Sequence, residues 1–243
     1  MSEIFVNEYI QLVQESPALV EQVNTLLELY YLLDQLNTAV RFLYPHNQCN
    51  TGCTTCCEGT SVPVVYSLEW GFIYNFIKSL DDDIQKEIVT RTKDFHSLYK
   101  HILWQIHDNI SGIPNKEKLY KFLDILPQLE QTVCPFLVLG KCGIYPVRPA
   151  KCRAHGCFLF QFEETIQLHA CPAELERLEA YLQRQGSRKV LMPIWNFFEK
   201  KLVDLHTEDL VATIIPIWLY AHLDGDKLTD TIIKKPDFDK LRE

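Results

Sequence analysis

The nine cysteines of this 243-residue chain are unevenly spread, and eight of them fall in two short segments. The first segment reads CNTGCTTCCEG and the second reads CPFLVLGKCGIYPVRPAKCRAHGC, where repeated Pro and Gly favour loops. The eight residues are Cys49, Cys53, Cys56, Cys57, Cys134, Cys142, Cys152 and Cys157, and Cys171 follows alone. Clusters of this kind are typical of metal sites, so the sequence predicts a fold organised around cysteine-bearing loops.

A disulfide framework fits these cysteines poorly, because their number is odd and Cys56 and Cys57 are adjacent. The segment MSEIFVNEYIQLVQE lacks the positive charge and unbroken apolar core of a secretion signal. No stretch reaches the roughly 20 apolar residues that a membrane-spanning helix needs. We therefore expect a cytoplasmic protein with no membrane insertion, whose thiols stay reduced.

Ligand chemistry limits which metals can bind, but it does not identify a single one. Soft thiolates select zinc, iron or an iron–sulfur cluster over magnesium and calcium. Eight cysteines can form two four-thiolate sites or one mixed site, and their spacing does not choose between these. Because adjacent residues seldom both reach one metal comfortably, Cys56 and Cys57 leave their division open. Cys171 is equally well interpreted as a ligand or as a buried small residue.

Local charge distinguishes the second segment from the rest of an acidic chain. Its span from Cys134 to Cys157 has four basic residues and no acidic one, whereas the whole chain has a net charge of −8. Nearby cations would lower thiol pKa values and offset thiolate charge; the alternatives are a solvated basic loop or a patch for an acidic substrate. His155 and His169 are candidates to ligate a metal or hydrogen-bond a sulfur. The acidic total argues against non-specific nucleic-acid binding.

Between the cysteines, apolar residues recur at helical spacing, which predicts a mainly α fold. We expect one helix over residues 17–44, with Pro17 in its first turn, a second from Ser67, and a third from Asp81 to about His107. Further predicted helices cover residues 116–131, 172–185, 190–206 and 208–223. Strand patterns are confined to residues 62–66 and 158–168. The four tryptophans lie in apolar helical patterns and are predicted to be core.

No internal repeat or Pro/Gly/Ser-rich linker divides the chain, so one helical domain over residues 1–226 is the simpler assignment. Its cysteine-cluster core spans about residues 49–171. The remaining segment, 227–243, is charged and is predicted to be a loosely held tail.

Two motifs carry a resemblance to the YkgJ-like cysteine-cluster family of zinc- or iron-chelating proteins. One is a set of spaced cysteines ending in the doublet Cys56–Cys57, although three residues separate Cys49 from Cys53 where the family usually has two. The other combines CPFL, GKCGIY and RPAKCR. The resemblance covers less than half of the chain and implies a fold and a metal site. The family is similar to flagellin lysine methylases, which suggests by analogy a protein- or peptide-modifying activity.

The function classes left open are an enzyme, a structural metal site, and a metal storage or delivery protein. The sequence has no Gly-x-Gly dinucleotide loop, no phosphate-binding loop, no Gly-x-Ser-x-Gly elbow and no His-Glu-x-x-His motif. An enzyme would act on a peptide through its metal or cluster, with Tyr145, Arg148 or His155 as candidates to orient the substrate. A structural site would hold loops between helices and would unfold on chelation.

Overall fold

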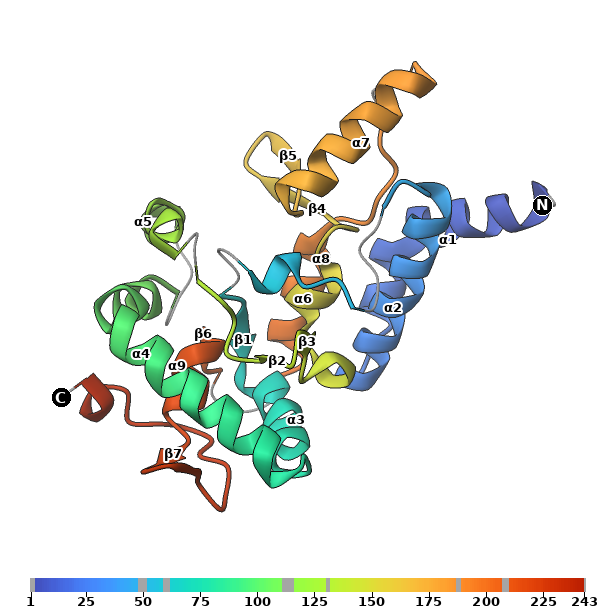
Figure 1. Cartoon of the computed structure of the whole chain (residues 1–243). Coiled ribbons are helices and arrows are strands. Elements are labelled where there is room, and N and C mark those ends of the chain that lie inside the picture. The colour runs from blue at the N-terminus through green and yellow to red at the C-terminus, as the bar shows by residue number, and fades with distance from the viewer. Residues whose placement is uncertain are drawn as a thin grey trace. The chain divides into compact units, whose positions relative to one another are not determined.

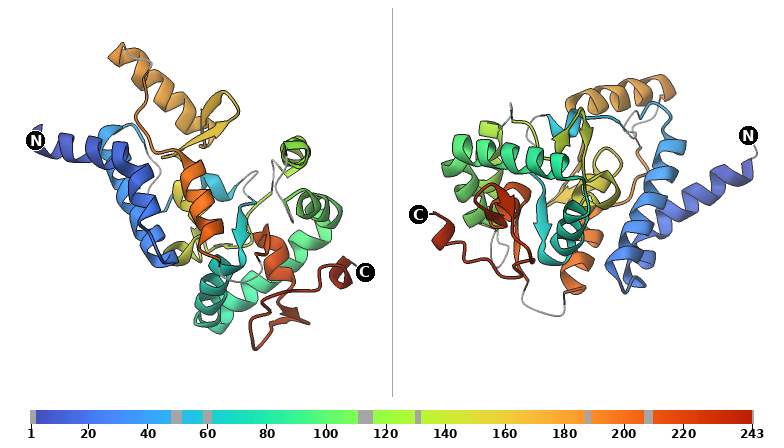
Figure 2. Two further views of the ribbon diagram at one scale, coloured as in Figure 1. Left: turned by 180° about the vertical axis from the view of Figure 1, so that it is seen from behind. Right: turned by 60° about the horizontal axis from the view of Figure 1, so that its bottom comes forward.

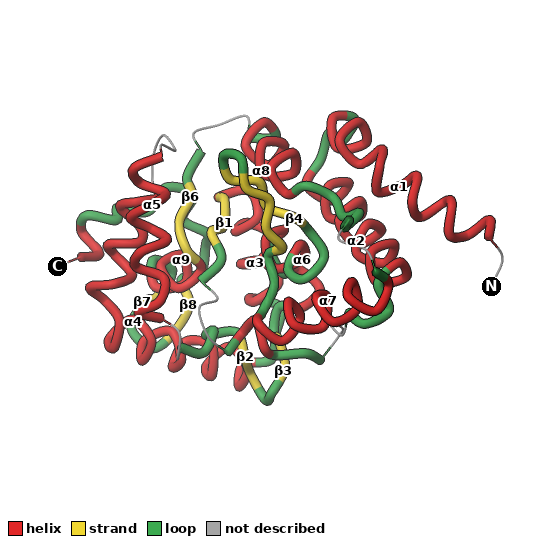
Figure 3. The backbone as a smooth tube through the Cα atoms, turned by 90° about the horizontal axis from the view of Figure 1, so that it is seen from above, coloured by secondary structure: helices red, strands yellow, loops and turns green. Residues whose placement is uncertain are grey.

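The computed structural model describes residues 3–47, 52–58, 62–110, 116–129, 132–186, 189–206 and 210–242. This part of the chain is mainly helical, as the sequence predicts, with short two-stranded sheets (Figures 1 and 3). Its α-helices are α1 (Glu3–Glu21), α2 (Leu26–Leu43), α3 (Ser67–Lys78), α4 (Asp82–Ile110), α5 (Lys116–Ile125), α6 (Ala150–Ala154), α7 (Pro172–Gln185), α8 (Trp195–Asp204) and α9 (Ile215–Tyr220). None of these described helices has the length and apolarity needed to cross a lipid bilayer.

The chain divides into two compact units, and each is built from two separate stretches of sequence. Unit 1 contains Met1–Cys53 and Ala150–Thr207, and unit 2 contains Thr54–Pro149 and Glu208–Glu243. The boundary at Pro149 falls within the second cysteine segment. The cysteines of that segment are therefore shared between the two units.

Unit 1 begins with a pair of helices where the sequence predicts one. The helix expected over residues 17–44 is interrupted, and Pro17 lies inside α1 and not in a first turn. The cause is a capping box: the Thr25 hydroxyl accepts the Glu28 backbone N–H (3.2 Å), and the Glu28 carboxylate accepts the Thr25 N–H (3.2 Å). This exchange satisfies backbone donors at a new helix start, so α2 begins at Leu26 and packs back on α1.

The rest of unit 1 follows the second cysteine segment. Strands β4 (Leu159–Phe162) and β5 (Thr165–Leu168) form an antiparallel hairpin, which confirms the strand pattern predicted over 158–168. Helix α7 matches its predicted range, whereas the helix expected from residue 190 begins only at Trp195, beyond Pro193. Phe158 and Phe198 meet edge to face at 5.2 Å and are both fully buried.

Unit 2 is organised around α3, α4 and α9, and α9 lies against α4 in each view of Figure 2. Strand β1 (Val64–Tyr66) pairs antiparallel with β6 (Ala212–Ile214), with Val64 opposite Ile214. The helix expected over 208–223 is therefore wrong over residues 212–214, which are extended and paired with β1, and its start at 208–209 lies outside the described residues. Helix α9 begins only at Ile215, where Pro216 fits because the first turn needs no N–H partner.

The core of unit 2 is rich in aromatic residues. Trp70 and Trp218 stack at 5.7 Å, and the Trp218 indole donates to the Val65 carbonyl (2.9 Å). All four tryptophans are buried, which confirms their predicted place in the core.

The charged C-terminal segment is packed rather than loosely held. The Tyr74 hydroxyl donates to the Thr229 carbonyl, and Leu228 is buried in the core. The Phe238 ring contacts Trp104 and His107. Short strands β7 (Leu223–Asp224) and β8 (Lys227–Leu228) form a hairpin ahead of these contacts. A few apolar side chains among the charges are sufficient to fix the segment.

Candidate functional site

Four of the predicted cysteine ligands come together in unit 2. Cys56 and Cys57 lie in the 3₁₀ turn η1 (Thr55–Cys57), whose N-terminal hydrogen bond runs from the Cys57 N–H to the Thr54 carbonyl (2.7 Å). The Cys134 N–H donates to the Cys57 carbonyl (2.8 Å), and the neighbouring residues Val133 and Glu58 form an antiparallel bridge. This backbone bond places the first cysteine of the second segment beside the doublet of the first.

A tight hairpin brings the fourth cysteine back to the same place. Strands β2 (Leu137–Val138) and β3 (Lys141–Cys142) pair with Leu137 opposite Cys142, and the turn between them has positive φ at Leu139 and Gly140. Gly143, which follows Cys142 at the end of β3, donates its N–H to the Phe136 carbonyl (2.8 Å). A Cβ at Gly143 would meet that oxygen at 3.3 Å, so the close approach favours glycine.

The Cys57 thiol is the centre of the cluster, because it hydrogen-bonds with the thiols of Cys56, Cys134 and Cys142. These bonds, together with burial, raise the pKa of Cys57, so this thiol keeps its proton and donates it. The bond from Cys57 lowers the pKa of Cys56 to about 7 and also lowers the pKa of Cys142. The single proton of Cys57, donated to one of these sulfurs at a time, thus favours a thiolate at Cys56 or at Cys142.

Arg148 adds a positive charge beside these sulfurs. Its charge is a further cause of the lowered pKa values of Cys56 and Cys142. The guanidinium carbon lies 4.2 Å from the centre of the Tyr145 ring, in cation–π geometry. Of the candidate substrate-orienting residues, Arg148 is therefore close enough to act on the thiols, and Tyr145 contacts Arg148.

The donor set of the four thiols fits a soft metal, whereas the arrangement seen here is held by S–H hydrogen bonds. Across the described residues, no group of three or more histidine, cysteine, aspartate or glutamate side chains is already arranged to hold a metal ion. The thiols converge on Cys57 and not on a common centre. Replacing protons by a cation would require the sulfurs to turn towards such a centre.

The other described cysteines lie in unit 1, and Cys49 lies outside the described residues. Cys152 is half-buried in α6, Cys171 is half-buried and caps α7, and Cys53 is exposed. Cys157 is fully buried, and its sulfur accepts the Asn47 amide (3.6 Å) and a bond from Arg41. No sequence motif indicates these two partners, because both precede the first cysteine segment.

His155 and His169 also lie in unit 1, close to each other. Their rings meet edge to face at 4.8 Å, and the Gly156 N–H donates to the His169 carbonyl (2.7 Å). Burial, followed by the charge of Lys151, lowers the pKa of His155 to about 4 and that of His169 to about 3. Both imidazoles are therefore neutral at physiological pH.

Comparison with known proteins adds no assignment: no family model, curated protein or solved structure matches the chain. The family resemblance seen in the sequence motifs accordingly stays a prediction.

Proposed function

We propose that this protein binds zinc, iron or an iron–sulfur cluster through the thiolates of Cys56, Cys57, Cys134 and Cys142. The single observation that carries the proposal is that the thiols of Cys56, Cys134 and Cys142, which come from the two cysteine segments, all lie within hydrogen-bonding reach of the Cys57 thiol. Buried cysteines that act only as small apolar residues have no reason to share protons in this way. Four cysteine sulfurs are a ligand set that zinc and iron–sulfur clusters take in proteins.

Charge supports the same conclusion. Four thiolates around a divalent metal leave a net charge of about −2, which a nearby cation stabilises. Arg148 supplies that cation, and its charge already acts on Cys56 and Cys142.

The role that the geometry supports best is a structural one. The ligands come from η1, from Cys134 and from β3, and η1 is far in the sequence from the other two. Cys134 and Cys142 also pack against the apolar core of unit 2. A metal at this place would join the three segments to one another and to the core, so its binding free energy would add to the stability of the fold.

An enzymatic role is the second candidate, and the position of Arg148 and Tyr145 beside the thiols favours it. In that role the metal or cluster would supply Lewis acidity or electron transfer, and Arg148 would bind an acidic group of a protein or peptide substrate. Storage or delivery of the metal is a third use of the same ligands. It requires exchangeable binding, which a closed structural site lacks.

Metal content of single variants tests the site. Cys57→Ser should lose the metal, because it removes the sulfur that all three neighbours contact. Cys53→Ser is the matched control, since Cys53 is close in sequence and exposed. Both variants are purified without oxygen, and zinc and iron are measured by elemental analysis. Unchanged metal per chain in Cys57→Ser would refute the proposed ligand set.

Two further measurements separate the roles. A broad visible absorption band in the anaerobic protein indicates an iron–sulfur cluster, whereas a colourless protein containing zinc indicates a zinc site. If the site is structural, a chelator that strips the metal should also lower the thermal midpoint of unfolding. Metal removal with an unchanged midpoint would instead favour metal delivery or catalysis.

A further inference from the structure

Lys151 occupies an unusual position in unit 1. It lies on α6, and its ammonium nitrogen is 4.6 Å from the centre of the Phe160 ring and 4.9 Å from that of Trp195. The side chain is half-buried, and burial lowers its pKa. Aromatic faces stabilise a cation, but they accept no conventional hydrogen bond from its N–H groups.

The ammonium also lacks an acceptor. Within the part of the chain that the structure describes, its interactions are the two ring contacts and longer-range attraction to Glu199 and Cys152. Glu199 favours the charge on Lys151 without forming an ion pair with it. A half-buried ammonium with three N–H donors and no acceptor is costly unless something else supplies oxygen atoms.

Two further polar groups near Lys151 are unpaired. The Nε1 of Trp195, on a side chain only 2% exposed, is buried without a hydrogen-bond partner. The Nε2 of His155 is also buried without a hydrogen-bond partner. This ring is close enough to Lys151 to be affected by its charge. The indole and the ammonium can only donate, and a neutral imidazole can donate as well. These groups therefore share a need for an acceptor.

The local charge decides which acceptor fits. Lys151 contributes one positive charge, and the attraction of Glu199 nearby offsets part of it. A phosphate dianion would find too little positive charge here, whereas a monoanion with two oxygens could accept from several donors at once. A carboxylate has this charge and this shape.

We propose that Lys151, together with Trp195 and His155, forms a binding site for the carboxylate group of a ligand. The ammonium is the charged anchor, the indole N–H and the imidazole are additional donors, and the Phe160 and Trp195 rings cover the ligand's apolar part. The ligand is a small carboxylic acid or an acidic side chain of a peptide, and both present the same group. Its residues all belong to unit 1 and include none of the four thiols.

The test is a titration of the purified, metal-containing protein at constant ionic strength, followed by NMR of the tryptophan indole N–H groups. The probes are acetate, a blocked tripeptide with a central glutamate, and inorganic phosphate. Trp195→Phe identifies the Trp195 resonance. We expect this resonance to shift saturably with acetate or the peptide. Whichever of the two binds more tightly identifies the source of the carboxylate.

Two variants complete the test. Lys151→Met should weaken carboxylate binding about tenfold or more, because it removes a charged hydrogen-bond donor. Lys200→Met, an exposed change on α8, should leave the affinity unchanged. If Lys151→Met does not fold, calorimetry of Trp195→Phe replaces it, with a loss of roughly threefold to tenfold expected.

Three results would overturn the proposal. The first is a Trp195 resonance that does not move with acetate or the peptide. The second is an affinity that is the same in the wild type and in the variant tested. The third is phosphate that binds more tightly than either carboxylate, since the charge balance around Lys151 argues for a monoanion.

Discussion

At the scale of single residues, Leu139 is the clearest departure from what its local structure prefers. It occupies the first position of the two-residue turn between β2 and β3, with φ of 51°, and its side chain is 83% exposed. A left-handed conformation costs an ordinary L-residue roughly 1–2 kcal/mol, and Asn-Gly is the pair that such a turn favours. The exposed side chain recovers little of that cost by burial.

Leu139→Asn should therefore stabilise the protein by about 1 kcal/mol, because asparagine tolerates the left-handed region. Urea unfolding followed by circular dichroism measures the change. Leu98→Asn is the control, since Leu98 is also an exposed leucine (74%) but lies in α4. There the substitution should cost a few tenths of a kcal/mol in helix propensity. A loss of stability in Leu139→Asn would contradict the argument from backbone strain.

Sequence reasoning predicted that cysteines of the two segments share a site, but it did not predict which of them come together. It also predicted that basic residues of the second segment offset the negative charge of thiolates. Arg148, one of these residues, acts on Cys56 and Cys142. It could not show that Cys57 is the centre, because that depends on the backbone bond between Cys57 and Cys134. Nor does spacing show that Cys142 and Cys152 belong to different compact units.

At the scale of elements, the break between α1 and α2 shows how a cap overrides periodicity. Apolar spacing continues through residues 17–44, yet the chain leaves the helix before Asn24 and re-enters at Leu26. The Glu28 carboxylate accepts the backbone N–H groups of both Asn24 (2.7 Å) and Thr25 (3.2 Å). Reading the T-x-x-E pattern at Thr25 as a helix start would have corrected the prediction.

Thr25→Ala removes one half of this capping box and should destabilise the protein by about 1 kcal/mol. A thermal melt followed by circular dichroism should show a midpoint lower by about 2–4 °C. Thr38→Ala is the matched control: Thr38 is exposed on α2 and its hydroxyl donates to the Asp34 carbonyl within the helix. We expect that change to be neutral or slightly stabilising. Equal losses in both variants would show that Thr25 has no special role.

Strand β6, in contrast, could not have been predicted from local sequence. Its apolar residues continue into α9 without alternation, and a short apolar run of this kind does not distinguish strand from helix. Its extended form depends on pairing with β1. Such a partner is not visible in any local window of sequence.

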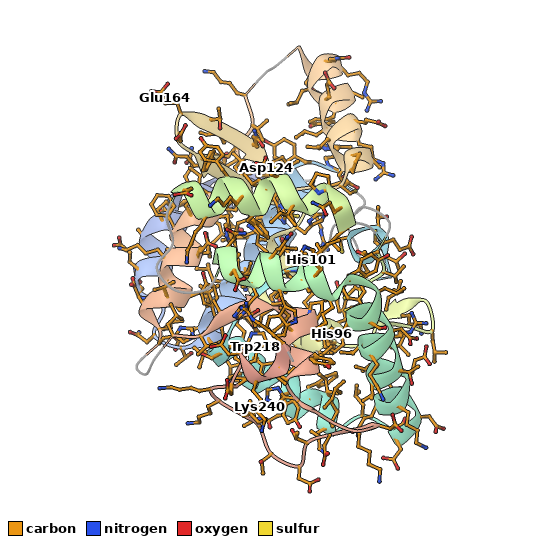
Figure 4. The ribbon with its side chains drawn as sticks, turned by 90° about the vertical axis from the view of Figure 1, so that its left-hand side faces the viewer. His96, His101, Asp124, Glu164, Trp218 and Lys240 are labelled. Carbon is orange, nitrogen blue, oxygen red and sulfur yellow. The ribbon has the colours of Figure 1, made fainter. Side chains whose placement is uncertain are left out.

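At the scale of the whole molecule, burial of histidine makes the fold sensitive to acid. Burial lowers the pKa of seven of the eight histidines, and it brings those of His96 and His107 to about 4. The seven are His46, His96, His107, His155, His169, His206 and His222. Figure 4 labels His96 on α4 together with His101, which is exposed on the same helix.

The free energy of unfolding should therefore fall as the pH is lowered from 7 to 5. Between pH 6.5 and pH 4 the unfolded chain binds protons that the buried rings exclude, so protonation favours unfolding. For His96 and His107, whose pKa values are about 4, the loss should be on the order of 1 kcal/mol each. Urea unfolding at the two pH values measures it.

His107→Gln should reduce this pH dependence, since glutamine does not titrate and can still bond the Thr213 hydroxyl that His107 contacts at 2.8 Å. His101→Gln should leave the pH dependence as it is. If the wild type, His107→Gln and His101→Gln all lose the same free energy of unfolding between pH 7 and pH 5, His107 contributes nothing to the pH dependence.

The pairing of β1 with β6 also has a consequence for how the protein is made. Strand β1 belongs to the first quarter or so of the chain, whereas its partner belongs to the last stretch of unit 2. At usual rates of translation, roughly 10–30 s separate the synthesis of the two strands. For that time a nascent chain on the ribosome carries β1 without its hydrogen-bonding partner, and an unpaired strand edge is a site of association with other chains. Chaperone protection during translation matters most in this interval, and a stop codon placed before β6 leaves the edge permanently open.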